Sequence, residues 1–271
     1  MTKRVKRTLG FGIPAVCVLL AVACVLLVWR NGRVTKTRFR ADYTDAGYQA
    51  AKAAGRYTPV ALRHPVGGAE LSIEEIYADK RSVLIRYTVT GGDKPLSGDS
   101  SSYRLADKCR IEIDGAVYDK AEQAQEATGS ENGRYEAALL LSADDPEGFS
   151  FSRSARLVLT VDGLPDQPEP VKLETTFEVY EAASEDTDVS RKIDGRTVRL
   201  KAIEKGAATL TFRFDKAADE GLESISLRSG NQTFQPVQIL YSESLVQFPA
   251  LKEGASYTVQ VNGQTLYDGV Y

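Results

Sequence analysis

The feature that most constrains this chain is an uncharged apolar run, Leu9–Trp29, near the start of the sequence. As an α-helix it would extend about 32 Å, which matches the hydrocarbon core of a bilayer. Basic residues flank it on both sides, and Trp29 stands where an interfacial aromatic residue is expected. The sequence therefore predicts one transmembrane helix at 9–29, with membrane lipid contacted by residues 9–40.

Two other interpretations of this run are a cleaved secretory signal and a lipoprotein signal. A cleaved secretory signal has an apolar region of roughly 7–15 residues before a small-residue cleavage site. Ala21-Val22-Ala23 is the one such pattern here, and with the next residue, Cys24, it also forms a poor lipoprotein box. Either form of processing would leave the apolar residues that follow without a role, so an uncleaved span is preferred.

Charge is divided sharply along the chain. Residues 1–40 hold nine of the 34 basic residues and no acidic ones, which leaves 25 basic and 37 acidic residues and a net charge of −12 beyond them. An acidic body argues against nucleic acid as a partner. The basic collar at 30–40 either lies against anionic headgroups or simply flanks the span.

The short N-terminal tail, residues 1–8, decides the expected orientation of the span in the membrane. Four basic residues precede the span and five follow it, so the positive-inside count is nearly balanced. Long domains cross membranes largely regardless of charge, and a tail of eight residues offers little to export. We therefore expect a cytoplasmic N terminus and an extracellular body.

The number and positions of the cysteines indicate which kinds of exported protein this chain resembles. Cys17 and Cys24 lie in the apolar run, so Cys109 is alone in the body and no disulfide forms within it. This fits neither a disulfide-stapled secreted module nor a cysteine-bound zinc site. An exported domain without disulfides favours a Gram-positive bacterium.

Beyond the collar the periodicity changes from helical to alternating. Residues 41–55 predict one helix that Gly55 ends, either a juxtamembrane switch or stalk or a helix packed on the base of the first domain. From Tyr57 onward apolar and polar residues alternate, with turn signals every 8–12 residues, as in antiparallel sandwiches. The acidic stretch 181–190 has no apolar pattern and marks a domain boundary.

The predicted fold is all-β, with two tandem Ig-like antiparallel β-sandwich domains behind a single N-terminal transmembrane helix. The lack of long internal helix patterns argues against a parallel α/β enzyme fold. The expected divisions are a cytoplasmic tail (1–8), the transmembrane helix (9–29), a basic collar and juxtamembrane helix (30–58), a first sandwich (59–182), a linker (183–189) and a second sandwich (190–271).

The apolar pattern of the first hairpin recurs 127 positions later, so that residues 71–87 coincide with 198–214. In both copies a step of three interrupts the alternation, from Ile73 to Ile76 and from Leu200 to Ile203, and this predicts a bulge. A second echo aligns 157–163 with 257–263. Duplication explains both echoes, and so does the general likeness of alternating strands.

Few residues are candidates for catalysis. His64 is the chain's one histidine, so any Ser-His-Asp, Cys-His or His-rich metal arrangement must use it. It stands before the first expected strand without a patterned nucleophile, and is interpreted as an ordinary loop histidine. Cys109 lies between Lys108 and Arg110, whose charges could lower its pKa. A small buried residue at a strand start is the preferred interpretation.

Acidic turns at 144–148 and 162–166 could offer oxygen ligands to calcium, but neither matches the EF-hand pattern, and solvated turn acids are the simpler explanation. The polar segments 91–107 and 121–133 are predicted to be an exposed loop and a mobile loop, respectively. The sequence thus predicts no catalytic, cofactor-binding or metal residue, and no cofactor.

The segment Val66–Tyr87 joins a glycine pair, an alternating strand that ends near Tyr77-Ala78-Asp79, and an apolar strand that ends in tyrosine. In these residues the chain resembles the domain of unknown function that forms the extracytoplasmic part of many Gram-positive ECF-type anti-sigma factors and related membrane proteins. The resemblance covers the span and the first sandwich. An anti-sigma factor also needs a cytoplasmic helical segment to hold its sigma factor, and eight residues before the span do not supply one.

These features predict a non-enzymatic, single-pass cell-membrane protein that senses, binds or scaffolds an unidentified envelope or cell-wall partner. The resemblance implies an accessory role to an anti-sigma or stress regulator, without the sigma-binding segment. The alternative is a lipoprotein anchored through Cys24 that acts as an exported ligand-binding protein or enzyme.

Overall fold

The computed structural model describes residues 41–91, 96, 100–118, 122–129, 133–143, 148–215 and 224–271. In this part of the chain a single α-helix, α2 (Ala41–Ala53), precedes eighteen strands in four antiparallel sheets, so the all-β class is confirmed. The predicted span at 9–29, its tail and its basic collar at 30–40 lie outside the described residues. Within those residues, no helix has the length and apolarity needed to cross a bilayer.

The strands fall into two sets of nine. The first set is β1 (Thr58–Val66), β2 (Ala69–Ala78), β3 (Ser82–Gly91), β4 (Cys109–Ile113), β5 (Ala116–Tyr118), β6 (Glu122–Gly129), β7 (Arg134–Ser142), β8 (Ser154–Val161) and β9 (Val171–Glu178). The second set is β10 (Ala183–Ile193), β11 (Arg196–Lys205), β12 (Thr209–Phe214), β13 (Ile225–Ser229), β14 (Gln232–Phe234), β15 (Gln238–Leu240), β16 (Leu245–Pro249), β17 (Ser256–Val261) and β18 (Gln264–Val270).

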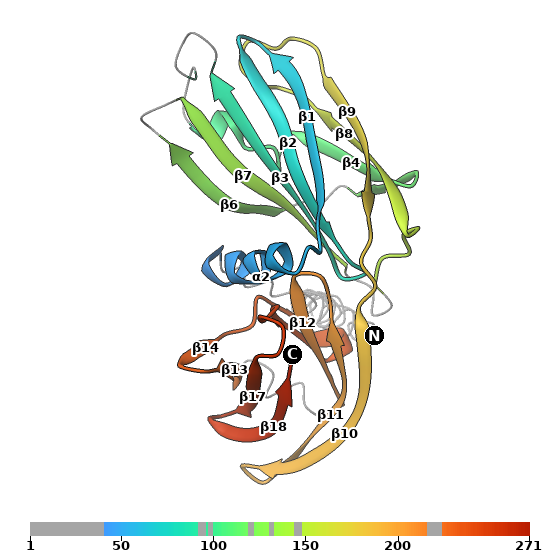
Figure 1. Ribbon diagram of the computed structural model, residues 1–271, viewed down its shortest axis with the longest axis vertical. Coiled ribbons are helices and arrows are strands. Elements are labelled where there is room, and N and C mark those ends of the chain that lie inside the picture. The colour runs from blue at the N-terminus through green and yellow to red at the C-terminus, as the bar shows by residue number, and fades with distance from the viewer. Residues whose placement is uncertain are drawn as a thin grey trace, which may run out of the picture.

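Each set forms two sheets, and the strand order is the same in both sets. The first set pairs as β1-β2-β3-β7-β6 and β5-β4-β8-β9, and we call it the N-terminal sheet pair. The second set pairs as β10-β11-β12-β16-β15 and β14-β13-β17-β18, the C-terminal sheet pair. Figure 1 shows the two pairs stacked along the long axis, with α2 at the level where they meet.

The repeat extends to the register of the first three strands. A bulge between Ile73 and Glu75 recurs 127 residues later, between Leu200 and Ala202, as the apolar pattern predicts. A second bulge, between Pro59 and Leu62, recurs at the same offset between residues 186 and 189. The two sheet pairs therefore share one backbone arrangement, including these two bulges, whereas the irregularities at 124–126 and at 259–260 have no counterpart in the other pair. The second echo is confirmed in the same sense, because 157–161 and 257–261 belong to the corresponding strands β8 and β17.

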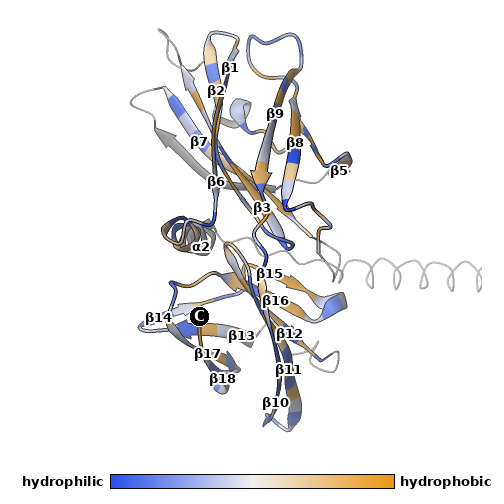
Figure 2. Ribbon diagram, turned by 45° about the vertical axis from the view of Figure 1, so that its right-hand side comes forward, coloured by the Kyte–Doolittle hydropathy of each residue, from blue (hydrophilic) through white to orange (hydrophobic). Residues whose placement is uncertain are grey.

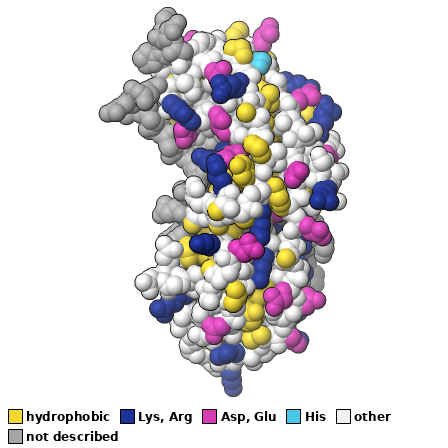
Figure 3. Space-filling model, in the orientation of Figure 1, with side chains coloured by type: hydrophobic (Ala, Val, Ile, Leu, Met, Phe, Trp, Pro, Cys, Tyr) yellow, Lys and Arg dark blue, Asp and Glu magenta, His cyan; other side chains and the backbone are white. Residues whose placement is uncertain are grey.

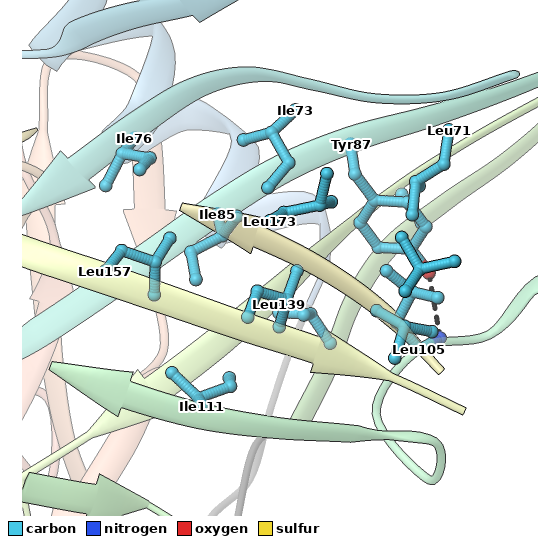
Figure 4. Packing of buried hydrophobic residues seen from close by; sticks show 14 of the residues in the cluster. Leu71, Ile73, Ile76, Ile85, Tyr87, Leu105, Ile111, Leu139, Leu157 and Leu173 are labelled. Atoms are coloured by element: carbon cyan, nitrogen blue, oxygen red, sulfur yellow. Dashed lines mark hydrogen bonds between the residues drawn. The ribbon is translucent and has the colours of Figure 1, made fainter. Parts of the chain in front are cut away.

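Each pair encloses its own core, built from the inward residues of both its sheets. In the N-terminal pair, inward leucines and isoleucines from β2, β3, β4, β7, β8 and β9 interdigitate, as Figure 4 shows. The buried Tyr87 hydroxyl accepts a hydrogen bond from the Leu105 amide (3.1 Å) and donates one to the Tyr103 carbonyl (3.1 Å). Tyr103 and Leu105 are thus core residues, although their segment is predicted to be an exposed loop.

Three further local predictions are wrong, all at sheet edges. The predicted linker, 183–189, is the first part of β10, and Glu122–Gly129 of the predicted mobile loop forms β6. His64 lies within β1 rather than before the first strand. β1, β6 and β10 are edge strands, held on one side by backbone hydrogen bonds, so they need little apolar patterning. β10 is accordingly largely hydrophilic (Figure 2).

Candidate functional site

The two sheet pairs meet through equivalent turns. The turn at 79–82 joins β2 to β3, and the turn at 206–209 joins β11 to β12. In each, the first residue's amide donates to the fourth residue's carbonyl, at 3.0 Å from Asp79 to Ser82 and 2.8 Å from Gly206 to Thr209. The first three side chains differ in kind, since Asp-Lys-Arg-Ser stands opposite Gly-Ala-Ala-Thr, and only the fourth position has a hydroxyl in both turns. We call the contact between these turns, together with α2, the junction.

Asp79 links the two turns directly. Its carboxylate is fully buried and accepts hydrogen bonds from the amides of Arg81 (2.7 Å) and Ser82 (2.9 Å) in its own turn. It also accepts one from the amide of Ala207 in the opposite turn, at 2.7 Å. Burial raises the pKa of Asp79 above its usual value, although the three amides and the charge of Arg81 oppose the shift.

The opposite turn makes room for this carboxylate. A Cβ atom on Gly206 would lie 2.4 Å from Asp79 Oδ2, well inside van der Waals contact. Gly206 is therefore required for packing, because a larger residue would displace a carboxylate that three hydrogen bonds hold in place.

A second buried contact carries full charges across the junction. Arg81, 1% exposed, donates through Nε to Glu204 Oε2 (2.9 Å) and through a terminal nitrogen to Oε1 (3.1 Å). Arg213 also donates to Oε1 (3.1 Å), and Lys80 Nζ lies 3.6 Å from Oε2. Burial alone would raise the pKa of Glu204, but the hydrogen bonds and charges of these three cations hold it below its usual value.

Helix α2 is the third part of the junction. It ends as the sequence predicts, with Gly55 at φ +68° and a Schellman pair of hydrogen bonds from Gly55 to Lys52 (3.0 Å) and from Arg56 to Ala51 (2.8 Å). One face of the helix, which carries Gly47, Tyr48 and Ala51, is buried, as expected for residues three and four apart.

This face touches both sheet pairs. Tyr48 and Ala51 pack on an outer apolar patch of the N-terminal pair that includes Leu84 and Leu140. Gly47 lies against the C-terminal pair so closely that a Cβ atom would stand 2.3 Å from the carbonyl oxygen of Ala208. The helix thus packs in the angle between the two sheet pairs. It contacts the C-terminal pair as well as the base of the N-terminal pair.

An ion pair fixes the end of the helix to the N-terminal pair. Lys52 Nζ lies 2.9 Å from Glu75, which is 6% exposed and also receives a 2.7 Å hydrogen bond from Arg86. Glu75 stands at the bulge of β2, so this irregularity turns a carboxylate toward the outer face beneath α2. The charged groups of the junction are therefore mutually paired, which suits them to hold three parts of the chain in a fixed arrangement.

The residues that the sequence singled out for chemistry lie elsewhere and apart. His64 is half-buried on edge strand β1, opposite Leu71 of β2. Cys109 is a free, half-buried thiol at the start of β4. Burial, followed by the charge of Asp107, raises its pKa to about 12, which is the reverse of the activation that neighbouring Lys108 and Arg110 suggested.

The proposed calcium ligands receive no support as a site. Asp162 uses its carboxylate to accept a hydrogen bond from the Gly163 amide (2.7 Å), and Asp166 adopts a turn conformation with φ +55°. Residues 144–147 lie outside the described residues. In the described part of the chain, no group of three or more histidine, cysteine, aspartate or glutamate side chains is arranged to hold a metal ion.

Sequence reasoning missed the junction because Asp79-Lys80-Arg81 looks like an ordinary solvated turn. The signal that could have found it is the offset of 127 itself, which aligns this charged turn with Gly206-Ala207-Ala208. Figure 3 shows why surface charge gives no help, since residues of both signs are spread over the visible face rather than gathered in one patch.

Comparison with known proteins adds little to this geometry. No protein-family model matches the chain, and no curated protein does. Among solved structures, the chain is similar to the crystal structure of the conserved domain protein from Bacillus anthracis, at 12% sequence identity and a TM-score of 0.47. That likeness covers 76% of this chain and 77% of the other.

Proposed function

We propose that this protein is a non-enzymatic, single-pass membrane protein whose body lies outside the cell and senses, binds or scaffolds an envelope or cell-wall partner. The observation that carries the proposal is the position of α2. It begins at Ala41, soon after the apolar run that ends at Trp29, and its buried face contacts both sheet pairs. An anchor that leads directly into a joint between two bodies suits a protein that presents them at a set orientation to the membrane.

We also propose that each sheet pair is an Ig-like sandwich domain. Two antiparallel sheets over one core, built from short strands, support this assignment for both pairs. Such sandwiches expose their loops at the two ends, where partners commonly bind. An accessory role to a Gram-positive anti-sigma or stress regulator rests on the resemblance at Val66–Tyr87 alone.

A non-enzymatic role fits the groups near the junction. Among its buried ionisable side chains, Asp79, Arg81 and Glu204 are bonded to one another or to backbone amides, so these three are not free to act on a substrate. Pairing instead offsets the desolvation cost that each of these buried charged groups would have if it had no partner.

Protease treatment of intact, wall-stripped cells tests the topology. With an epitope tag after Tyr271, we expect the tag to be lost from intact cells while a cytoplasmic control protein survives. Retention of the tag until the cells are lysed would place the body inside the cell and contradict the proposal.

The mass of the mature N terminus separates the two anchors. An uncleaved span keeps residues 1–23, whereas lipidation of Cys24 would remove them and add acyl chains. Cys24→Ser should leave the membrane fraction unchanged if the span is the anchor. Loss of membrane attachment in this variant would support the lipoprotein alternative, an exported ligand-binding protein or enzyme.

A further inference from the structure

A small cavity lies within the junction. Its polar lining residues are Tyr48 of α2, Ser82 and Ser142 at the ends of β3 and β7, and Thr209, Gln238 and Gln247 of the C-terminal pair; Leu140, Ala208, Val237 and Pro249 complete the lining. It offers about 20 Å³ of room for the centre of a water-sized molecule. The cavity therefore touches all three parts of the junction at once.

The polar groups on the C-terminal side are buried without partners. Gln238 is 4% and Gln247 3% exposed, and Gln238 Oε1, Gln247 Nε2 and Thr209 Oγ1 have no hydrogen-bond partner among the described residues. The hydroxyl of Thr211, which lies next to Gln247 across the β12–β16 ladder, is also buried without a hydrogen-bond partner among the described residues. Buried polar atoms are nearly always bonded to protein or to ordered water, so these atoms point to a bound molecule.

The N-terminal pair shows that the fold does not require polar residues here. Thr211 corresponds to Leu84 at the offset of 127, and each pairs across its ladder with a residue of the next strand, Gln247 or Leu140. Leu84 and Leu140 face α2 through apolar contacts. The same backbone positions thus carry leucines against the helix in one copy, where Leu140 also lines the cavity, and hydrogen-bonding side chains in the other.

Chemistry and size define the occupant. The unpartnered atoms include an amide donor, an amide acceptor and a hydroxyl, and no charged side chain lines the cavity. The occupant must therefore be neutral and both donate and accept hydrogen bonds. A water needs about 10–15 Å³ by this kind of measure, so the cavity has room for one or two waters.

We propose that this cavity is a hydration site, in which one or two ordered waters bridge the amides of β15 and β16 to the hydroxyls near the N-terminal pair. Bridging waters would satisfy the buried amides and extend the junction by hydrogen bonds that neither sheet pair makes alone.

Magnetic relaxation dispersion of water ²H and ¹⁷O, measured on the full chain in detergent, counts long-lived internal waters. We expect Gln247→Leu to lose one or two of these waters relative to the wild type. Gln232→Leu makes the same chemical change at an exposed position of β14 and should lose none. An unchanged count in Gln247→Leu, or an equal loss in both variants, would overturn the proposal.

A crystal structure of the wild-type chain gives a second test that needs no variant. Density for water within hydrogen-bonding distance of both Gln238 Oε1 and Gln247 Nε2 supports the site. An empty cavity, or a larger organic molecule in an enlarged one, contradicts it.

Discussion

The turns at 79–82 and 206–209 occupy the same place in two copies of one backbone unit, yet they have opposite roles. The first turn supplies the buried charges of Asp79 and Arg81, while the second supplies an amide at Ala207 and the space left by Gly206. The backbone hydrogen bond that closes each turn is the same. The difference teaches that a repeated fold becomes a specific joint through a few complementary side chains, without any change in the path of the chain.

Arg81→Met should have the largest effect on this arrangement, because it leaves the buried Glu204 carboxylate without its bidentate partner. Removing one member of a buried ion pair costs about 3–5 kcal/mol. Lys80 and Arg213 remain near Glu204, so we expect a loss at the lower end of this range in urea unfolding of the purified chain.

Arg156→Met is the matched control. Arg156 pairs with Glu174 at 2.6 Å on the exposed face of β8, with 63% of its side chain exposed. Solvent screens an exposed pair of this kind, so the change in stability should be small. Equal losses of stability in the two variants would show that the buried pair of Arg81 and Glu204 contributes no more than the exposed pair of Arg156 and Glu174.

Gly206→Ala should cause the second largest loss of stability, because the added methyl group fills the space that the second turn leaves for Asp79. Overpacking of this kind costs about 1–3 kcal/mol. If the clash with Asp79 is the cause, the double variant with Asp79→Ala should lose less than the sum of the two single losses. Additive losses in a double-mutant cycle would mean that the two turns do not act on each other.

Gly47→Ala tests the place of α2 between the two pairs. The added methyl group meets the Ala208 carbonyl, but alanine also favours a helix over glycine by about 1 kcal/mol, so the net loss of stability should be small. We expect faster hydrogen exchange in α2 and at Ala250, whose amide donates to Ala208. Gln49→Ala, on the exposed face of the helix, should leave both regions unchanged. Protection that stays the same in Gly47→Ala would place the helix away from the C-terminal pair.

The smallest effect concerns pH. The pKa of Glu204 is lowered in the folded chain, so its contribution is present above the usual glutamate value of about 4.3 and is lost as the pH falls through the folded value. Asp79 acts in the opposite direction, since its raised pKa favours the folded chain as it becomes protonated. Glu204→Gln should therefore flatten the fall in thermal stability below about pH 4. A steeper fall in this variant would contradict the assigned charge state.

Much of the fold follows from local pattern. Alternating apolar residues predict β2, β3, β11 and β12 and even their bulges, because a bulge shifts the inward face by one residue and leaves a step of three. Asp114-Gly115 is a dipeptide typical of two-residue hairpin turns, and it joins β4 to β5 with both residues at positive φ (50° and 86°). Gly55 predicts the end of α2 for a similar reason.

Edge strands and the junction do not follow from such patterns. β6 and β10 are edge strands that backbone hydrogen bonds hold on one side, so they need little apolar patterning and hydropathy makes them look like loops. Arg81 looks exposed because its burial depends on Glu204, a residue 123 positions away. Contacts of that kind are set by how the two sheet pairs meet, which no window of sequence contains.

The shared register of the two copies has a consequence for folding. β3 and β12 offer the same backbone to a partner, so an unfinished chain could pair β12 with β2 or β7 and exchange strands between copies. Synthesis from the N terminus reduces this hazard, because the first copy can close its own sheets before the second emerges. Phe212 of β12 replaces the smaller Ile85 of β3, so an exchanged strand would also fit poorly in the core of the N-terminal pair.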